Sequence, residues 1–245
     1  MLAKDMLFKD VVLIGSNSDI GISIINRIQL ANGANVHLIG RRTPMQGTMK
    51  NSNINLIFHK CDLSNITEVT KFLYSLTKFE KSELVILSAG VLPEENSEYN
   101  LSILKETFTV NTVASIMFLS RFAGIMNENK GGKILVCSSV ASIRPRLKNF
   151  SYGASKSALD FYAVGLQNKL RKSEVKVLIL RPGYVFTKMT TNFKPAPFAI
   201  ELDTLAKIAF NGLIKNKKVI YAPSKLKIIM NVFKFIPRHI FNRFG

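Results

Sequence analysis

Short apolar, β-branched runs alternate along the chain with longer stretches that show helical periodicity. We predict strands over seven of these runs: Asp10–Ile14, Asn35–Ile39, Asn55–His59, Leu84–Ser88, Lys133–Ser138, Val175–Leu180 and Val219–Tyr221. Nearly continuous apolar strands separated by helices are typical of parallel strands that are covered on both faces. The pattern therefore predicts an α/β fold with a doubly wound, seven-stranded parallel sheet, helices on both faces, and a ligand at the carboxyl ends of the strands.

The length of 245 residues fits a single domain. We expect residues 1–203 to form a nucleotide-binding core that also carries the catalytic residues, and residues 204–245 to form a basic, helical C-terminal extension of the same domain. Residues 184–203, with Pro195 and Pro197, follow a strand end and lack clear periodicity. Such a stretch is predicted to be a substrate loop or lid.

The composition is typical of a globular protein, since 47% of the residues are hydrophobic. No apolar run approaches the ~18 residues that a membrane span needs, and Val11–Ile14 is too short for the apolar part of a signal peptide. Cys61 and Cys137 each lie in or beside an apolar strand, so we interpret them as reduced core residues. A reducing compartment, and hence a cytoplasmic location, is expected.

The formal net charge of +18 is unevenly distributed. Residues 204–245 contain no Asp or Glu and nine cationic residues: Lys207, Lys215, Lys217, Lys218, Lys225, Lys227, Lys234, Arg238 and Arg243. Nucleic acid, an anionic bilayer or a phosphorylated substrate would each suit this charge. An A/T-rich genome that favours lysine codons is the alternative explanation.

A glycine-containing turn joins the first predicted strand to an apolar helical face. It comprises Gly15, Ser16, Asn17, Ser18, Asp19, Ile20 and Gly21. Gly15 would permit the tight turn, Gly21 would let the helix approach the strand, and free N–H groups of the first helical turn could bind a pyrophosphate. This predicts a Rossmann-type dinucleotide site, whereas the alternative is a turn whose glycines serve geometry alone.

The next two strands end in charged residues. Arg41 and Arg42 follow the second strand, where a site for NAD would usually offer a carboxylate to the ribose 2′-hydroxyl, so NADP(H) is favoured over NAD(H) as the cofactor. Asp62 and Leu63 follow the third strand, placing a carboxylate where an adenine amino group could bind. The alternatives are solvated arginines and a plain helix N-cap at Asp62.

Ser139 ends the fifth predicted strand, and Tyr152 and Lys156 follow on a predicted helix. Positions i and i+4 share a helix face, so the Lys156 ammonium is expected to lower the pKa of the Tyr152 phenol below its reference of about 10. The phenol could then exchange a proton with a carbonyl or alcohol oxygen that Ser139 also binds. The alternative is a surface Tyr–Lys pair without chemistry. No metal site is predicted.

With these motifs the sequence resembles the short-chain dehydrogenase/reductase family over nearly its whole length. Further matching positions are Ser88, Ala89, Gly90, Asn111, Arg181, Pro182, Gly183 and Thr187. The resemblance implies that Asn111 joins a water relay with Lys156, that the backbone from Pro182 to Val185 holds the nicotinamide, and that Thr187 contacts its carboxamide or the diphosphate. Asp19 and Ser88 depart from the family's glycine and asparagine. Asp19 near a pyrophosphate is unfavourable, although it could act as a helix N-cap.

Several segments resemble one branch of that family, the decaprenylphosphoryl-2-keto-ribose reductases: Asn149–Gly153, Leu159–Tyr162, Arg181–Gly183, Lys194–Pro197, Tyr221–Pro223 and Ile236–Phe241. An acid at the position of Asp19 also occurs in that branch. The resemblance implies reduction of the 2-keto group of a polyprenyl-phosphate-linked pentofuranose, which yields the lipid-linked arabinose donor of cell-wall arabinan. It also implies a homo-oligomer formed through helices near 101–127 and 152–171, and leaves open a partner flavin oxidase that supplies the keto substrate.

The tail gives a separate reason to consider a lipid. Leu226, Ile229, Met230, Phe233 and Ile236 recur at helical spacing beside Lys225, Lys227 and Lys234, and Pro237 ends this helix before Ile240, Phe241 and Phe244. A peripheral membrane contact through residues 222–245 is therefore predicted, with a helix folded on the core or a subunit contact as the alternative.

Two other functions remain as alternatives. One is reduction or oxidation of a soluble or hydrophobic substrate, such as a steroid, a fatty-acyl group or a small secondary alcohol. The other is a non-catalytic NADP(H)-binding regulator or a nucleic-acid-associated protein. The complete Ser–Tyr–Lys set and the lack of a nucleic-acid-binding motif argue against the latter, so no nucleic-acid partner is expected.

Overall fold

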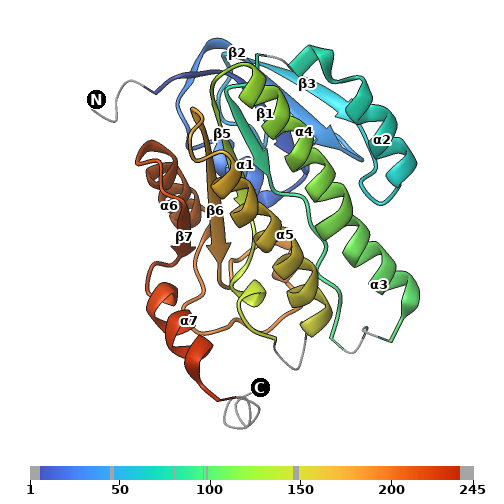
Figure 1. The fold of residues 1–245 in the computed structure, drawn as a ribbon, viewed down its shortest axis with the longest axis vertical. Helices are drawn as coiled ribbons and strands as arrows, with labels where there is room; N and C mark the ends of the chain where they lie inside the picture. Colours follow the sequence, from blue (N-terminus) through green and yellow to red (C-terminus); the bar gives the residue numbers. More distant parts are fainter. Residues whose placement is uncertain are drawn as a thin grey trace.

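A computed structural model describes residues 6–44, 47–79, 81–95, 97, 99–145 and 149–237. Seven parallel strands form one sheet in the order β3-β2-β1-β4-β5-β6-β7 (Figure 1). Their bounds are β1 Phe8–Ile14, β2 Leu30–Gly40, β3 Ile54–Lys60, β4 Leu84–Leu87, β5 Gly132–Cys137, β6 Val175–Pro182 and β7 Val219–Ala222. The predicted fold class and all seven predicted strands are confirmed.

Helices cover both faces of the sheet because successive strand residues point to opposite sides. Val11 and Leu13 pack in the layer that holds α1 (Asp19–Ile25) and α6 (Leu202–Ile214), whereas Val12 and Ile14 pack in the opposite layer. The latter layer contains α2 (Ile66–Tyr74), α4 (Ser115–Glu128) and α5 (Phe150–Lys169). Short helices also form at η1 (Leu76–Phe79) and η3 (Val140–Ser142).

A long helical segment runs through α3 (Leu101–Phe108), a π-helical turn η2 (Thr109–Ala114) and α4. By length and composition it could cross a membrane, but half of its most apolar window is buried inside the protein. Phe118 and Phe122 of α4 are fully buried against the sheet layer. These contacts are those of a core helix in an α/β domain.

The segment after β6 is folded rather than extended. A β-bridge pairs Val185 with Ile200, and the Tyr184 hydroxyl donates to the carbonyls of Thr190 and Phe193 at 2.7 and 2.8 Å. A short helix η5 (Lys188–Thr190) lies between them, and α6 begins at Leu202, within the loop predicted over 184–203. The loop is therefore closed at its base by its own hydrogen bonds.

The chain continues from α6 through β7, which pairs with β6, into α7 (Leu226–Phe235). Leu226 and Met230 of α7 are buried against Val140 and Tyr221, with Phe233 partly buried beside them. The predicted membrane face contained these residues, and that assignment was wrong because this face of the helix packs on the protein. Ile240, Phe241, Phe244 and most of the predicted Ile236–Phe241 motif lie outside the described residues.

Candidate active site

A cavity of about 640 Å³ lies at the carboxyl ends of the strands. It is lined by residues from the glycine turn, the ends of β2 to β6 and the loop after β6. Its lining includes every predicted site residue except Asn111 and Gly21, namely Gly15, Ser16, Asn17, Asp19, Ile20, Arg41, Arg42, Asp62, Leu63, Ser88, Ala89, Gly90, Ser139, Tyr152, Lys156, Pro182, Gly183, Val185 and Thr187. Its volume is within the ~300–1,000 Å³ range that is usual for ligand sites.

The glycine turn needs glycine at two positions. Gly15 has φ +100°, and a Cβ there would lie 2.8 Å from the backbone nitrogen of Ala89. At Gly21 a Cβ would lie 2.5 Å from the Leu13 side chain, so this glycine lets α1 pack closely on β1 and does not line the cavity. Backbone atoms of the turn are therefore free to approach a dinucleotide closely.

Ser18, not Asp19, caps α1. The Ser18 hydroxyl accepts from the backbone N–H of Gly21 at 3.2 Å and lies 2.6 Å from the Ser88 hydroxyl. Ser88 thus supports the cap from the end of β4, which gives a physical reason for serine at the position where the family has asparagine.

Asp19 faces the loop after β6. Its carboxylate accepts from the backbone N–H of Lys188 at 2.7 Å and lies 3.4 Å from the Lys188 ammonium. The prediction that Asp19 could serve as an N-cap was wrong, because its side chain binds a segment distant in sequence. The Lys188 charge compensates the carboxylate that would otherwise face a phosphate.

The ends of β2 and β3 place three charged side chains in the cavity lining. The Arg42 carbonyl accepts from Ser16 Oγ at 2.7 Å and from Asn17 Nδ2 at 3.1 Å, which ties β2 to the glycine turn. Arg41 lies 3.9 Å from Glu106 and is largely exposed. Asp62 accepts from both the backbone and the hydroxyl of Ser64.

Asp62 is therefore part of a local turn, whereas the N-cap of α2 is Asn65. Burial opposes ionisation of Asp62, but the hydrogen bonds from Ser64 and the charge of Arg41 outweigh it and lower the pKa of this carboxyl. The carboxylate is thus ionised and available as an acceptor at neutral pH.

Ser139, Tyr152 and Lys156 converge on the same cavity. Ser139 caps η3, where its hydroxyl accepts from the Ala141 N–H at 3.1 Å, and its interaction with the Tyr152 phenol favours a lower pKa of that phenol. The Lys156 ammonium lies 6.0 Å from the centroid of the Tyr152 ring and donates to the Cys137 carbonyl at 3.2 Å. The turn after β5 and the helix α5 thus bring a serine hydroxyl, a phenol and a cation to one cavity.

The predicted direction of the Tyr152 pKa was wrong for this state of the protein. Burial raises the pKa of Tyr152 to about 12, although the hydrogen bond from Ser139 opposes the rise. Burial also lowers the pKa of Lys156 to about 8. The phenol is therefore protonated at neutral pH, which suits a group that donates a proton to a carbonyl oxygen under reduction.

Asn111 lies in the π-helical turn η2 and is fully buried. Its amide oxygen accepts from the Val91 N–H at 2.8 Å, and its amide nitrogen donates to the Val91 carbonyl and to Ser155 Oγ. A Cβ on Gly90 would lie 3.2 Å from the Lys156 ammonium and 3.3 Å from the Asn111 oxygen. Glycine at 90 therefore keeps open the space between these two groups, behind the cavity wall.

The family model for short chain dehydrogenases matches residues 9–197 of the chain. This chain belongs to the short-chain dehydrogenase/reductase family. Members of this family are NAD(P)-dependent oxidoreductases, and the cavity described above is the candidate site for the cofactor and a small-molecule substrate. A relative from Mycobacterium tuberculosis, known as an uncharacterized oxidoreductase, is 31% identical over 64% of this chain and 64% of its own length.

Solved structures of the family share the fold. A short-chain dehydrogenase from Burkholderia cenocepacia in complex with NADP has a TM-score of 0.75 at 16% identity, covering 97% of this chain and 100% of that one. A short-chain dehydrogenase from Sphingobium yanoikuyae in complex with NADPH has a TM-score of 0.76 at 19% identity, covering 94% and 97%. Both similarities concern the fold alone.

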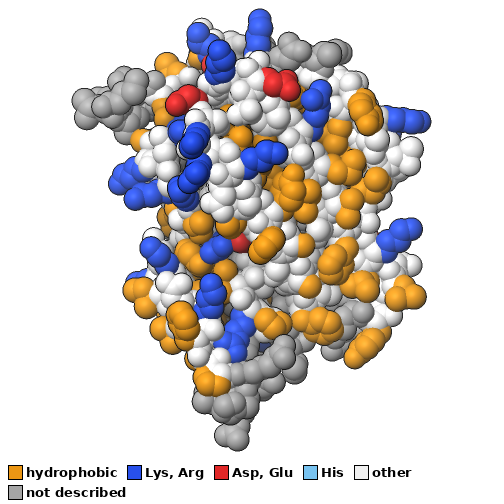
Figure 2. Space-filling view, in the orientation of Figure 1, with side chains coloured by type: hydrophobic (Ala, Val, Ile, Leu, Met, Phe, Trp, Pro, Cys, Tyr) orange, Lys and Arg blue, Asp and Glu red, His pale blue; other side chains and the backbone are white. Residues whose placement is uncertain are grey.

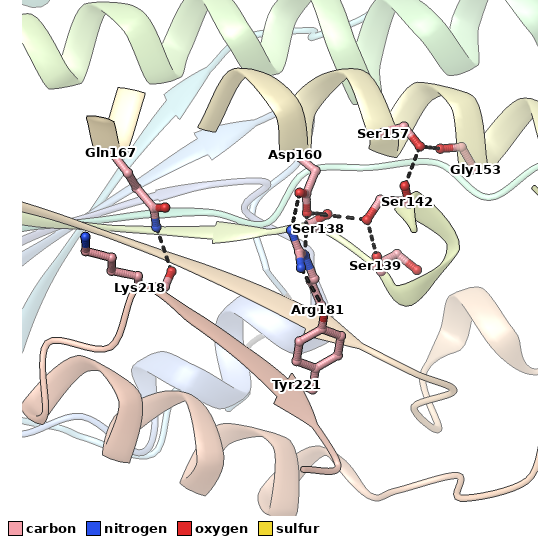
Figure 3. A network of polar contacts seen from close by, with 10 residues as sticks. All are labelled: Ser138, Ser139, Ser142, Gly153, Ser157, Asp160, Gln167, Arg181, Lys218 and Tyr221. Atoms are coloured by element: carbon pink, nitrogen blue, oxygen red, sulfur yellow. Dashed lines mark hydrogen bonds and ion pairs between the residues drawn. The ribbon is translucent and has the colours of Figure 1, made fainter. Parts of the chain in front are cut away.

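This short-chain dehydrogenase/reductase also contains a buried polar network that sequence reasoning missed (Figure 3). Asp160 of α5 and Arg181 of β6 form a two-pronged ion pair with N–O distances of 2.9 and 2.6 Å. Arg181 also donates to the Tyr221 hydroxyl at 2.7 Å, and the Asp160 carboxylate accepts from Ser138 at 2.6 Å and Ser142 at 3.3 Å.

The network reaches Ser139. The Ser142 hydroxyl donates to the Ser139 carbonyl at 2.6 Å. Asp160 therefore contacts both Ser138, the neighbour of Ser139, and Ser142, which binds the Ser139 backbone. Asp160 and Arg181 belong to the segments Leu159–Tyr162 and Arg181–Gly183, but sequence spacing gave no reason to pair them. The only signal in the sequence was an acid within a long predicted helix together with a basic residue at a strand end.

Proposed function

We propose that the protein reduces a ketone with NADPH, and that its substrate is the 2-keto group of a polyprenyl-phosphate-linked pentofuranose. The observation that carries the reductase assignment is the convergence of Ser139, Tyr152 and Lys156 in the cavity that also contains the glycine turn. Burial raises the pKa of Tyr152 to about 12, so the phenol is protonated at neutral pH and can donate a proton to a carbonyl oxygen.

The residues present fit a nicotinamide dinucleotide. Gly15 leaves room for close approach to the turn, and the guanidinium groups of Arg41 and Arg42 suit the additional phosphate of NADPH. Asp62 would accept from the adenine amino group, and the segment from Pro182 to Val185 together with Thr187 would hold the nicotinamide end. The bound cofactor would supply the hydride.

The protein's own residues handle the proton and the oxygen. Ser139 and Tyr152 would both hydrogen-bond the carbonyl oxygen, and Tyr152 would donate its proton as negative charge develops there. Lys156 would stabilise the resulting phenolate, and we assign Asn111 to hold the water that returns a proton through Lys156. The Asp160–Arg181 pair would keep Ser139 in place.

The choice of a lipid-linked sugar rests on the resemblance of the motif segments and on the cavity wall. Met189, Ala196, Pro197 and Leu226 give part of the cavity wall an apolar character, while Asn149, Tyr184 and Thr190 add polar groups. A sugar attached to a prenyl chain combines both characters. A cytoplasmic location at the inner face of a membrane, and a flavin oxidase that supplies the keto substrate, belong to the same proposal.

We also propose that the protein forms a homo-oligomer through α3, α4 and α5. Leu101 of α3 and Phe161 of α5 are 78% and 84% exposed, and Val113 of η2 is 45% exposed. Figure 2 shows hydrophobic side chains gathered over the side of the molecule where these helices lie in Figure 1. Exposed apolar side chains on adjacent helices are typical of a subunit contact.

The deciding experiment follows the oxidation of NADPH and of NADH with two substrate sets, polyprenylphosphoryl-2-keto-ribose in detergent and a panel of soluble ketones. Turnover with the lipid-linked sugar at a kcat/KM well above every soluble ketone is expected. Turnover with soluble ketones alone would leave the reductase chemistry standing and refute the lipid-sugar substrate. Tyr152→Phe protein serves as the control for non-enzymatic oxidation.

A further inference from the structure

The helix α7 is apolar on two sides. Its inner side holds Leu226 and Met230, which are 6% and 3% exposed and pack on Val140 and Tyr221. Its outer side presents Ile228, Val232 and Phe235, which are 71%, 57% and 84% exposed. The i, i+4 and i+7 spacing places these three on one helix face, so the exposed apolar side chains form a continuous stripe.

Cations surround this outer stripe. Lys225, Lys227 and Lys234 are all exposed, and the Arg144 guanidinium donates to the Phe233 carbonyl near the end of the helix. Residues 204–245 contain no Asp or Glu. Figure 2 shows hydrophobic and basic side chains intermingled over the end of the molecule where α7 lies in Figure 1.

We propose that the outer face of α7, formed by Ile228, Val232 and Phe235 with their flanking lysines, binds the surface of an anionic membrane. An apolar stripe flanked by lysines is the arrangement of helices that lie in a bilayer interface, where the apolar side chains enter the headgroup boundary and the cations meet lipid phosphates. A symmetric contact with a second copy is disfavoured, because it would bring the lysines of both helices together with no acid on the segment to compensate them.

The position of α7 connects this surface with the active site. Leu226, at the start of the helix, lines the cavity that contains Ser139 and Tyr152. The inner side of α7 is fixed to Val140, the residue after Ser139, and to Tyr221, which binds Arg181. A membrane bound at the outer side therefore lies beside the cavity wall, where a lipid-anchored ketone could enter without leaving the bilayer.

The test is co-sedimentation of the protein with two kinds of vesicle. One contains phosphatidylcholine alone, and the other also contains about 30% phosphatidylglycerol, which gives it the negative surface charge of an anionic membrane. We expect binding to the anionic vesicles, weakened by added salt. The triple variant Ile228→Ser/Val232→Ser/Phe235→Ser and the pair Lys227→Glu/Lys234→Glu should each lower binding about tenfold or more.

Matched controls lie on α2, which packs beside the other edge strand of the sheet. Tyr74→Ser removes a side chain that is 84% exposed, and Lys71→Glu reverses an exposed lysine. Both should bind vesicles like the parent protein. None of the substituted residues lines the cavity. Turnover of a soluble ketone by every variant should therefore stay within about twofold of the parent protein, and such turnover shows that the variant is folded.

Three results would overturn the proposal: no binding to either vesicle, equal loss in the α2 and α7 variants, or loss of self-association instead of vesicle binding in the α7 variants. The last would identify a second copy as the occupant. Vesicle binding is measured without substrate, so its failure is distinct from a failure of the lipid-sugar reductase assignment.

Discussion

The two sides of the cavity are built by different means. On the side of β1 to β3, backbone atoms and glycine form the surface, as shown by the 2.8 Å that a Gly15 Cβ would leave to Ala89. On the side of α5, β6 and β7, long-range side-chain pairs hold the structure, above all Asp160 with Arg181. The first side suits a ligand common to many enzymes, whereas the second can vary with the substrate.

This difference predicts that substitutions on the two sides have different effects. Changes on the glycine side should alter cofactor binding, and changes on the other side should alter turnover and stability. Tyr152 lies where the two sides meet.

The largest effect is expected for Tyr152→Phe. Loss of the proton donor should lower kcat for ketone reduction by about 10²–10⁴-fold. The Kd of NADPH, measured by the change in cofactor fluorescence, should stay within about threefold because the ring is retained. Tyr162→Phe on the same helix is the control and should keep full activity; a Tyr152→Phe enzyme with parental turnover would remove Tyr152 from the proton step.

The second prediction concerns the buried pair. Asp160→Asn should lower the free energy of unfolding by about 3–5 kcal/mol, since it leaves Arg181 without its buried counter-charge. Urea unfolding measures the loss, and kcat should fall more than the KM of the ketone changes, because Ser139 is displaced. Glu174→Gln breaks the exposed Glu174–Lys176 pair and should cost about 1 kcal/mol or less. Equal losses in the two variants would mean that burial of the pair is unimportant.

The third prediction uses pH. Lys156 has a pKa lowered to about 8, so kcat/KM for the ketone should be constant below pH 8 and fall about tenfold per pH unit above it as the cation is lost. Stability should move the other way. Between the folded pKa and the ordinary lysine pKa of 10.5, the unfolded chain binds the additional proton, so the contribution of Lys156 to stability rises with pH.

Activity and urea midpoint measured between pH 7 and 10 would separate the two effects. Lys156→Met should abolish both pH dependences. If kcat/KM of this variant still falls above pH 8, the titrating group must be a residue other than Lys156.

The fourth prediction tests the cofactor side. Arg42→Ala should lower the ratio of kcat/KM for NADPH over NADH by about tenfold, which corresponds to the loss of one charge-assisted contact with a phosphate. Arg41→Ala should act in the same direction. Arg27, an exposed arginine just after α1, does not line the cavity, and its replacement by alanine should leave the ratio unchanged. An unchanged ratio in all three variants would argue that NADPH is not preferred.

The smallest effect is expected at the contact between the two sides. Asp19→Gly removes the partner of Lys188, an exposed cation, so the KM of the ketone should rise by about two- to fivefold. Lys188→Gln should act similarly, and the double variant should be no worse than either single one. Strictly additive effects would mean that the two residues act separately.

The sequence predicted the sheet and most of the cavity lining because both depend on local signals. Apolar runs identify buried strands, and Gly15, Ser139, Tyr152 and Lys156 occur at strand ends or on one helix face, which alone brings them to one edge of the sheet. The N-cap at Ser18 and the asparagine cap of α2 were mistaken for roles of Asp19 and Asp62, since several polar residues in a row can cap a helix.

Long-range pairs could not be predicted in the same way. Asp160 and Arg181 meet only after α5 has crossed the sheet, and Asp19 and Lys188 are brought together by the folding of the loop after β6. The sequence also predicted the wrong exposed face for α7, since Leu226 and Met230 are buried. Helical spacing shows that a helix has apolar stripes but not which stripe packs on the core. The raised pKa of Tyr152 depends on burial, which spacing does not reveal.

Asp19 and Lys188 also bear on how this protein could be redesigned. The loop after β6 is the natural part to exchange when a new specificity is sought, but its anchor lies in the glycine turn. A transplanted loop without a cation at position 188 would leave the Asp19 carboxylate beside the cofactor's phosphates with no compensating charge. Turn and loop therefore form a single interchangeable module, and must be grafted together.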